Sequence, residues 1–254
     1  MRIRDRAFMV TGGGSGLGAA TARQLVAHGA KVMLIDISTK AAELADELGN
    51  SASFVRADVT DAVQAQCIMD EFAANHGELS GLINCAGVAP VEKVVGRDGP
   101  HGLDSFIRTV HVNLVGAFNM LRLAATLMTK NEPTPEGERG VIVNTASIAA
   151  YDGQIGQAGY AASKGGVVAM TLPIARELAR FGIRVCAIAP GIMETPMLAS
   201  MPLDVQQALG KMVPFPARLG RPDEFAGLVL HILENSYLNG EVIRLDGGIR
   251  MAPK

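Results

Sequence analysis

Short apolar runs alternate with longer amphipathic stretches along most of the chain. The runs at 7–10, 32–35, 53–57, 81–83, 141–143, 184–189 and 241–245 are typical of buried strands. Stretches rich in Ala and Leu predict helices at 17–28, 41–48, 63–76, 104–129 and 222–234, with a further helix around Tyr160. This alternation predicts an α/β fold in which helices cover both faces of a parallel sheet. Because no repeat or linker divides the pattern, we predict a single domain over residues 1–254.

A glycine-rich turn, Thr-Gly-Gly-Gly-Ser-Gly-Leu-Gly, separates the first predicted strand from the first predicted helix. Glycines let a backbone approach a pyrophosphate closely, and a helix N-terminus favours its negative charge. One dinucleotide-binding register uses Gly14, Gly16 and Ala19. Another uses Gly12, Gly16 and Gly18, and the sequence leaves both open.

Polar residues recur where the predicted strands end, at Asp36, Asp58, Asn84, Gly87 and Ser147. The carboxyl ends of parallel strands meet at one edge of a sheet, so these residues should line one cleft. Asp36 can accept hydrogen bonds from ribose hydroxyls and would repel a 2′-phosphate, which favours NAD over NADP.

Ser147, Tyr160 and Lys164 form the candidate catalytic set. Tyr160 and Lys164 are four residues apart and share one helix face. A nearby ammonium should lower the tyrosine pKa from about 10 toward neutrality. The serine hydroxyl can hold a carbonyl oxygen, so the set suits proton exchange with an alcohol while a hydride moves elsewhere. A Tyr–Lys pair alone is usually a surface pair, and the glycine turn is what favours chemistry here.

Two further polar residues have open roles. Asn113 lies between apolar neighbours and is interpreted as a structural hydrogen-bonding residue. Thr195 follows Pro190-Gly191 and either meets the carboxamide or phosphate of a cofactor or is an ordinary turn hydroxyl. Residues 193–216 are rich in Met, Leu and Pro and predict a mobile apolar lid over the substrate.

Composition narrows the function classes. The 254 residues include 23 basic and 25 acidic side chains, a net charge of -2. This balance gives no electrostatic case for nucleic acid or anionic membranes. The three cysteines lack metal-ligand spacing and fit a reducing compartment. No apolar run approaches the roughly 18–20 residues of a membrane span. We therefore expect a cytoplasmic protein without metal, nucleic acid or membrane partners.

These motifs together resemble the short-chain dehydrogenases/reductases. The residues that carry the resemblance are Gly12, Gly16, Gly18, Asp58, Asn84-Cys85-Ala86-Gly87, Asn113, Ser147, Tyr160, Lys164 and Pro190-Gly191. The resemblance implies a Rossmann-type seven-stranded parallel sheet, with Tyr160 as general acid/base and Lys164 on the nicotinamide ribose. It also implies that Asn113 supports a water-linked proton path. Cys85 departs from the second Asn that is common in this family.

Segments 153–158, 162–166, 171–176, 213–216 and 238–247 resemble a group within that family, the type II 3-hydroxyacyl-CoA dehydrogenases, also described as 17β-hydroxysteroid dehydrogenases. This resemblance implies reversible NAD-dependent oxidation of an (S)-3-hydroxyacyl-CoA, with hydroxysteroids or other secondary alcohols as further substrates, and a homotetramer. It places Gln154 near the substrate oxygen, beside Ser147 and Tyr160. The expected cofactor contacts are Gly12, Ser15, Gly16, Leu17, Gly18, Asp36, Asp58, Val59, Cys85, Ala86, Gly87, Tyr160, Lys164, Pro190, Gly191 and Thr195.

Two alternatives remain. A 3-ketoacyl-carrier-protein reductase would have the same fold but usually uses NADPH, which Asp36 disfavours. A scaffolding subunit of an RNA-processing assembly is a role associated with animal relatives of the group, but the near-neutral charge gives it no support. The sequence does not locate the cations that a CoA tail would need.

Overall fold

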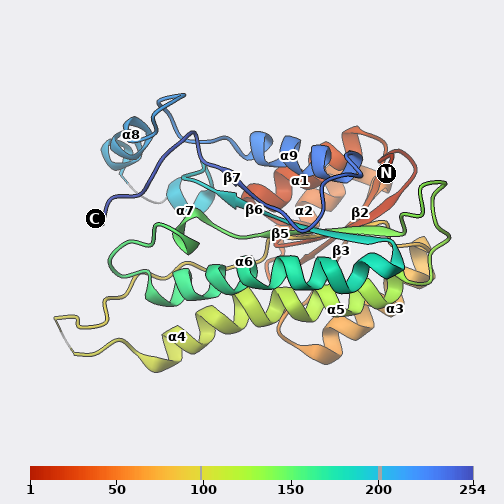
Figure 1. The fold of residues 1–254 in the computed structure, drawn as a ribbon, viewed down its shortest axis with the longest axis horizontal. Coiled ribbons are helices and arrows are strands. Elements are labelled where there is room, and N and C mark those ends of the chain that lie inside the picture. Colours follow the sequence, from red (N-terminus) through yellow and green to blue (C-terminus); the bar gives the residue numbers. More distant parts are fainter. Residues whose placement is uncertain (98, 200–201, 254) are drawn as a thin grey trace.

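The computed structural model describes residues 1–97, 99–199 and 202–253 (Figure 1). Strands from the whole length of the described chain form one seven-stranded parallel sheet, in the order β3-β2-β1-β4-β5-β6-β7. The strands are β1 (Ala7–Thr11), β2 (Lys31–Asp36), β3 (Ala52–Arg56), β4 (Gly81–Asn84), β5 (Gly140–Thr145), β6 (Ile183–Pro190) and β7 (Val242–Leu245). The predicted α/β class and the seven-stranded parallel sheet are confirmed.

Helices cover both faces of this sheet, as predicted (Figure 1). The α-helices are α1 (Gly16–Ala27), α2 (Lys40–Leu48), α3 (Ala62–His76), α4 (Leu103–Val110), α5 (Ala117–Met128), α6 (Ala158–Leu178), α7 (Pro196–Ala199), α8 (Leu203–Lys211) and α9 (Pro222–Glu234). Short turns of 3-10 helix are η1 (Gly49–Ser51), η3 (Ile148–Ala150) and η4 (Ala179–Phe181), and η2 (His111–Gly116) is a π-helix. One apolar core lies between the sheet and α1, α2 and α9, and a second lies between the sheet and α3, α5 and α6.

The central strands are buried on both faces, which explains their continuous apolar sequence. All eight residues of β6 are buried, and so are all five of β1. A strand that is covered on both sides loses the apolar–polar alternation of a half-exposed strand. The central part of the sheet therefore forms a rigid base for whatever lies beyond the strand ends.

Helix α9 shows how local sequence sets a boundary. Pro222 occupies the start of the helix, where its missing N–H costs nothing. The carboxylate of Glu224 accepts a hydrogen bond from the backbone N–H of Arg221 at 2.8 Å. Phe225 and Val229 are fully buried one turn apart and pack against the sheet. The predicted bounds of this helix, 222–234, are the observed ones.

The predicted helix at 104–129 is a continuous helical run from Leu103 to Met128, with the π-helix η2 in its middle. By length and composition this run could cross a membrane, which the sequence analysis did not anticipate. Close to half of its most apolar stretch is buried within the protein. Core helices of globular domains satisfy the same criterion, and α5 packs into the core beneath β4 and β5. This run is therefore weak evidence for a membrane segment.

The predicted lid, 193–216, contains α7 and α8, and its residues 200–201 lie outside the described residues. Its first residues form a stem with the chain just beyond its end: the N–H of Glu194 donates to the carbonyl of Gly220 at 2.8 Å. The N–H of Gly220 donates in turn to the carbonyl of Ile192 at 2.9 Å. Part of the segment is anchored, because Val213 is buried against Ile249. Its mobility stays a prediction.

Candidate active site

One cavity of about 600 Å³ lies at the carboxyl edge of the sheet. It opens where β1 pairs with both β2 and β4, so that the order of strands reverses, which is the usual ligand position in such sheets. The predicted site residues that line it are Gly12, Ser15, Gly16, Leu17, Gly18, Asp36, Asp58, Val59, Cys85, Ala86, Gly87, Ser147, Gln154, Tyr160, Lys164, Pro190, Gly191 and Thr195. Asn113 lies behind this lining.

The glycine turn packs so closely that side chains would not fit. Gly12 has φ 63°, and a Cβ there would lie 2.7 Å from the backbone nitrogen of Ala86. A Cβ on Gly18 would overlap the carbonyl oxygen of Gly12. These contacts require glycine at positions 12 and 18, and a φ of 52° favours glycine at Gly16, which both registers share. The N–H of Gly14 donates to Asp36.

Helix α1 begins inside the cavity wall. Ser15, at its N-cap, has an extended backbone and makes no side-chain capping bond. The N–H groups of the first turn, around Leu17, therefore remain for a ligand, and the positive end of the helix dipole favours an anion there.

Asp36 ends β2, and one of its carboxylate oxygens meets the glycine turn. Its Oδ2 accepts from the N–H of Gly14 and its Oδ1 from the N–H of Ser38, both at 2.9 Å. Each oxygen keeps lone-pair capacity for a hydroxyl donor. The structure also brings Arg56 close, where its Nε donates to the carbonyl of Ile37 at 3.1 Å. No sequence motif indicates that Arg56 lies here.

The loop after β3 is fixed by its own hydrogen bonds. Asp58 Oδ1 accepts from both the N–H and the hydroxyl of Thr60, at 2.9 and 2.7 Å. Asn119 donates to the carbonyl of Val59 at 2.9 Å, which ties the loop to α5. Asp58 and Val59 are thereby held in the cavity wall.

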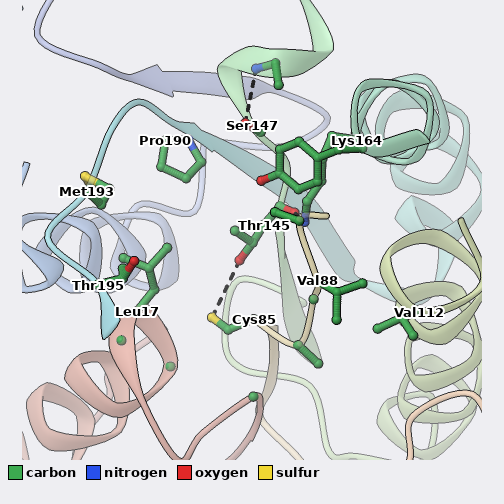
Figure 2. A pocket seen from close by; sticks show the side chains of 18 of the residues that line it. Leu17, Cys85, Val88, Val112, Thr145, Ser147, Lys164, Pro190, Met193 and Thr195 are labelled. Atoms are coloured by element: carbon green, nitrogen blue, oxygen red, sulfur yellow. Dashed lines mark hydrogen bonds between the residues drawn. The ribbon is translucent and has the colours of Figure 1, made fainter. Parts of the chain in front are cut away.

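Thr11 and Cys85 join the ends of β1 and β4. The hydroxyl oxygen of Thr11 accepts from the N–H groups of Cys85 and Ala86, both at 3.2 Å. The Thr145 hydroxyl donates to the Cys85 sulfur at 3.5 Å (Figure 2). Burial raises the pKa of the Cys85 thiol to about 11. Cys85 therefore stays a neutral thiol and serves in packing and hydrogen bonding.

Ser147, Tyr160 and Lys164 meet on the inner wall of the cavity. Ser147 follows β5, is buried, and accepts from the N–H of Ala149 at 3.1 Å. Tyr160 and Lys164 lie one turn apart on α6, and the Lys164 ammonium is 5.9 Å from the Tyr160 ring centre. Lys164 Nζ donates to the carbonyl of Thr145 at 2.6 Å, and Figure 2 shows these two with Ser147 on one side of the cavity.

The electrostatics of this wall differ from the prediction. Burial raises the pKa of Tyr160, and its hydrogen bond with Ser147 lowers it only in part. Burial also lowers the pKa of Lys164, to about 8. The expected lowering of the tyrosine pKa is therefore wrong for this structure, because desolvation of the phenolate raises it. Tyr160 is a neutral phenol at pH 7.

Asn113 acts as a brace in this structure. It lies in η2, is buried, and forms a paired contact with Val88: Oδ1 accepts from its N–H and Nδ2 donates to its carbonyl, both at 2.8 Å. Nδ2 also donates to the Ser163 hydroxyl at 3.0 Å, and that hydroxyl donates to the Tyr160 carbonyl. The structural role expected from the sequence alone is thus observed, and the role in a proton path stays a prediction.

The opposite wall begins where β6 ends. Pro190 and Gly191 line the cavity, and a Cβ on Gly191 would lie 2.9 Å from the Asp246 backbone. The Thr195 side chain lies over the glycine turn, 3.4 Å from where a Gly16 Cβ would stand. Thr195 is therefore placed to meet a group that spans the turn and the inner wall.

The substrate end of the cavity takes walls from distant segments. Gln154 donates through Nε2 to the Ala252 carbonyl at 3.0 Å, which ties it to the C-terminal segment. Arg244 holds that segment, donating to Asp246 at 2.7 Å and to Asp152 at 2.5 Å.

Sequence reasoning missed three kinds of lining residue. Thr145 ends a strand, so the strand-end rule that found Ser147 could also have found it. Arg108 and Met251 line the cavity from a helix and from the C-terminal segment, and no local motif marks either. Their placement depends on tertiary packing.

The cavity fits a nicotinamide dinucleotide. The close glycine turn leaves room where a Cβ would intrude, the uncapped start of α1 suits a pyrophosphate, and Asp36 offers acceptors to a ribose. Lys164 and Tyr160 lie further along the same cavity.

Comparisons with known proteins agree with this geometry. The family described as short chain dehydrogenase matches residues 6–206. The 3-hydroxyacyl-CoA dehydrogenase type-2 of Drosophila melanogaster is 52% identical over 254 residues, which cover 99% of this chain and 100% of the relative. The Homo sapiens protein of the same name is 51% identical over 254 residues, 99% and 97% of the two chains. The crystal structure of 3-hydroxyacyl-CoA dehydrogenase type-2 from Mycobacterium avium matches with a TM-score of 0.93 and 43% identity, over 98% and 97% of the chains.

Proposed function

The chain belongs to the short-chain dehydrogenase family, and we propose that it oxidises (S)-3-hydroxyacyl-CoA thioesters reversibly to 3-ketoacyl-CoA with NAD. The observation that carries this proposal is identity of about half, over the full length, with proteins named 3-hydroxyacyl-CoA dehydrogenase type-2. The grouping of Ser147, Tyr160 and Lys164 in one cavity supports the same reaction type.

Two of the inner-wall residues act on the substrate oxygen. When bound, NAD supplies the acceptor for the hydride that leaves the carbinol carbon. The Ser147 hydroxyl holds the substrate oxygen, and Tyr160 exchanges a proton with that oxygen. Since burial keeps the Tyr160 phenol protonated, it is prepared to donate a proton in ketone reduction. Oxidation needs the phenolate, so we expect its rate to rise as the pH increases above neutral.

We propose NAD rather than NADP because of Asp36. Its carboxylate lies beside the glycine turn, where hydroxyl groups of an adenosine ribose would find acceptors and a 2′-phosphate would meet a like charge. Arg56 lies near Ile37 and is the feature that argues the other way.

The test follows NADH absorbance with acetoacetyl-CoA, with NADPH in parallel and the Tyr160→Phe variant as control. We expect rapid oxidation of NADH, slower oxidation of NADPH, and little turnover by the variant. If NADH binds but acetoacetyl-CoA is not reduced, the acyl-CoA assignment is wrong, and steroids and other secondary alcohols become the next substrates to screen.

The alternatives predict different results. A 3-ketoacyl-carrier-protein reductase would prefer NADPH and the carrier-protein thioester over acetoacetyl-CoA. A scaffolding subunit of an RNA-processing assembly would bind RNA in a salt-dependent way at physiological ionic strength. With a net charge of -2, the chain offers no electrostatic support for that reading.

We also propose a homotetramer. Ile107, Val115 and Phe118 lie on one face of the long helix and are 53%, 42% and 47% exposed. Exposed apolar side chains in a row are typical of an interface. Light scattering after size-exclusion chromatography should give four times the chain mass, and Phe118→Glu should reduce it.

For location, we propose the cytoplasm. Cys67, Cys85 and Cys186 are all free, which fits a reducing compartment. Cell fractionation with an antibody to the protein would decide the point.

A further inference from the structure

Charged side chains are unevenly distributed around the cavity. Among the described lining residues they are Asp36, Asp58, Lys164 and Arg108. Asp36 ends β2 and Asp58 follows β3, whereas Arg108 is on α4, which lies toward the other end of the molecule (Figure 1). The cavity is thus acidic where a ribose would bind and basic at its substrate end.

The position of Arg108 on α4 follows from the contacts of its neighbours. Its neighbours Phe106 and Thr109 face α6, because a Cβ on Gly159 would lie 3.3 and 3.7 Å from their side chains. Val112 lines the cavity one helical turn, about 5.4 Å, further along (Figure 2). Arg108 therefore lies beside the start of α6, one turn from Val112 toward the loop that precedes α4.

The guanidinium of Arg108 is exposed and has no hydrogen bond or ion pair among residues 1–97, 99–199 and 202–253. Arg244, near the substrate end, is by contrast paired with Asp152 and Asp246. A planar guanidinium with five free donors is suited to phosphate oxygens.

The neighbouring walls are apolar. Val91, Ile148, Leu209 and Met251 line the cavity together with Val112. Among the described lining residues Arg108 is the one exposed cation, so the cavity suits a ligand with an apolar head and an anionic tail.

We propose that Arg108 binds the phosphate groups of the CoA tail and so determines the preference for acyl-CoA over smaller ketones. The inference rests on the proposed function and adds the residue that recognises the part of the substrate remote from the reacting carbon. The same chemistry would recognise the single phosphate of a phosphopantetheine arm, so the experiment separates the two sources.

The first test compares acetoacetyl-CoA with acetoacetyl-pantetheine, which has the same ketone and thioester but no phosphate. For Arg108→Gln we expect KM for acetoacetyl-CoA to rise about tenfold, with KM for acetoacetyl-pantetheine and for NADH nearly unchanged. The rise should shrink at high ionic strength. The matched control is Arg176→Gln, an exposed arginine on α6 outside the cavity lining. Equal shifts with both thioesters, or no shift, would overturn the proposal.

A third substrate, acetoacetyl-4′-phosphopantetheine, locates the contact. If Arg108→Gln raises its KM as well, Arg108 meets the phosphate next to the pantetheine arm. If only acetoacetyl-CoA is affected, it meets the phosphates on the adenosine side.

Binding of free coenzyme A to the NADH-loaded protein, measured by calorimetry, does not depend on turnover. We expect about tenfold weaker binding to Arg108→Gln and partial recovery in Arg108→Lys. Should acetoacetyl-CoA not be reduced, the proposed reaction fails, yet coenzyme A binding still decides the role of Arg108. If the unmodified protein does not bind coenzyme A, or both proteins bind it equally, the inference is wrong.

Discussion

The two ends of the cavity are built by different means. At the glycine turn, backbone packs on backbone: Gly12 lies against Ala86, and Gly18 lies against Gly12. At the substrate end, side chains hold separate segments together, with Arg244 bonded to Asp152.

The two kinds of construction suit two different tasks, cofactor binding and substrate selection. Backbone contacts leave no room for side-chain variation, which suits a ligand that never changes. Side-chain contacts between loops can be altered one at a time without disturbing the sheet, which suits the choice of substrate. The inner wall of Ser147, Tyr160 and Lys164 lies between the two.

Replacing Tyr160 with Phe should have the largest effect, because it removes the proton donor and leaves both ends intact. We expect kcat to fall about a thousandfold, within the range of general acid–base catalysis, with NADH affinity unchanged. Steady-state kinetics and NADH fluorescence titration measure the two. Tyr237→Phe, at a side chain that is 99% exposed, is the matched control. Substantial activity in Tyr160→Phe would contradict the mechanism.

Gly18→Ala should damage the cofactor end specifically. The new Cβ would overlap the Gly12 carbonyl, so the turn must shift. We expect about hundredfold weaker NADH binding and a loss of about 2–3 kcal/mol of unfolding free energy. Gly227→Ala, in α9 with nothing within 4 Å of its Cβ position, should be neutral or stabilising. Fluorescence titration and urea denaturation decide, and unchanged NADH affinity in Gly18→Ala would refute the close-packing argument.

Lys164 should make the stability of the inner wall depend on pH. Its pKa is lowered from 10.5 to about 8 by burial, so between these values the unfolded chain binds more protons than the folded one. The contribution of Lys164 to the free energy of unfolding is therefore greatest above pH 10.5, and it is lost as the pH falls to about 8. Relative to Lys164→Met, the protein should gain up to about 3 kcal/mol across this window. Urea denaturation at several pH values measures the difference, and parallel curves would show that Lys164 keeps its ordinary pKa.

Removing a side-chain contact at the substrate end should have the smallest effect on activity. Arg244→Met should free the C-terminal segment and the Asp152 loop, and KM for acetoacetyl-CoA should rise about tenfold. NADH affinity should change less than about twofold, because Arg244 lies away from the glycine turn. Adding Asp152→Asn should cost little more, since both changes remove one shared contact. Additive effects on KM would show that the two residues act independently.

The sequence was most informative where a local rule controls position. Asp36, Asp58 and Ser147 were located because parallel strands end at a common edge, and the glycine turn was recognised from its own spacing. Predictions from the sequence were less accurate for properties that depend on burial or tertiary packing. The direction of the Tyr160 pKa shift was predicted wrongly because desolvation is a property of the folded environment. Arg108 was missed because its orientation depends on how α4 packs on α6.

Asn113 and the lid were predicted from the sequence only in part. The residue type of Asn113 indicated hydrogen bonding, but its partner Val88 is 25 positions away in the chain. The composition of 193–216 indicated an apolar segment at the substrate, and Leu198 and Leu209 do line the cavity. The stem that closes its base involves Gly220, beyond the predicted end, and no composition rule would find it.

That stem also bears on how such enzymes diversify. Residues 192–194 and 220 lie side by side, so the segment between them begins and ends at neighbouring positions. Insertions and deletions there change the length of an already closed loop, and each doubling of a flexible loop costs only about 0.6 kcal/mol. Recombination can therefore exchange the whole lid in one step. The substrate range then changes while Ser147, Tyr160 and Lys164 stay the same.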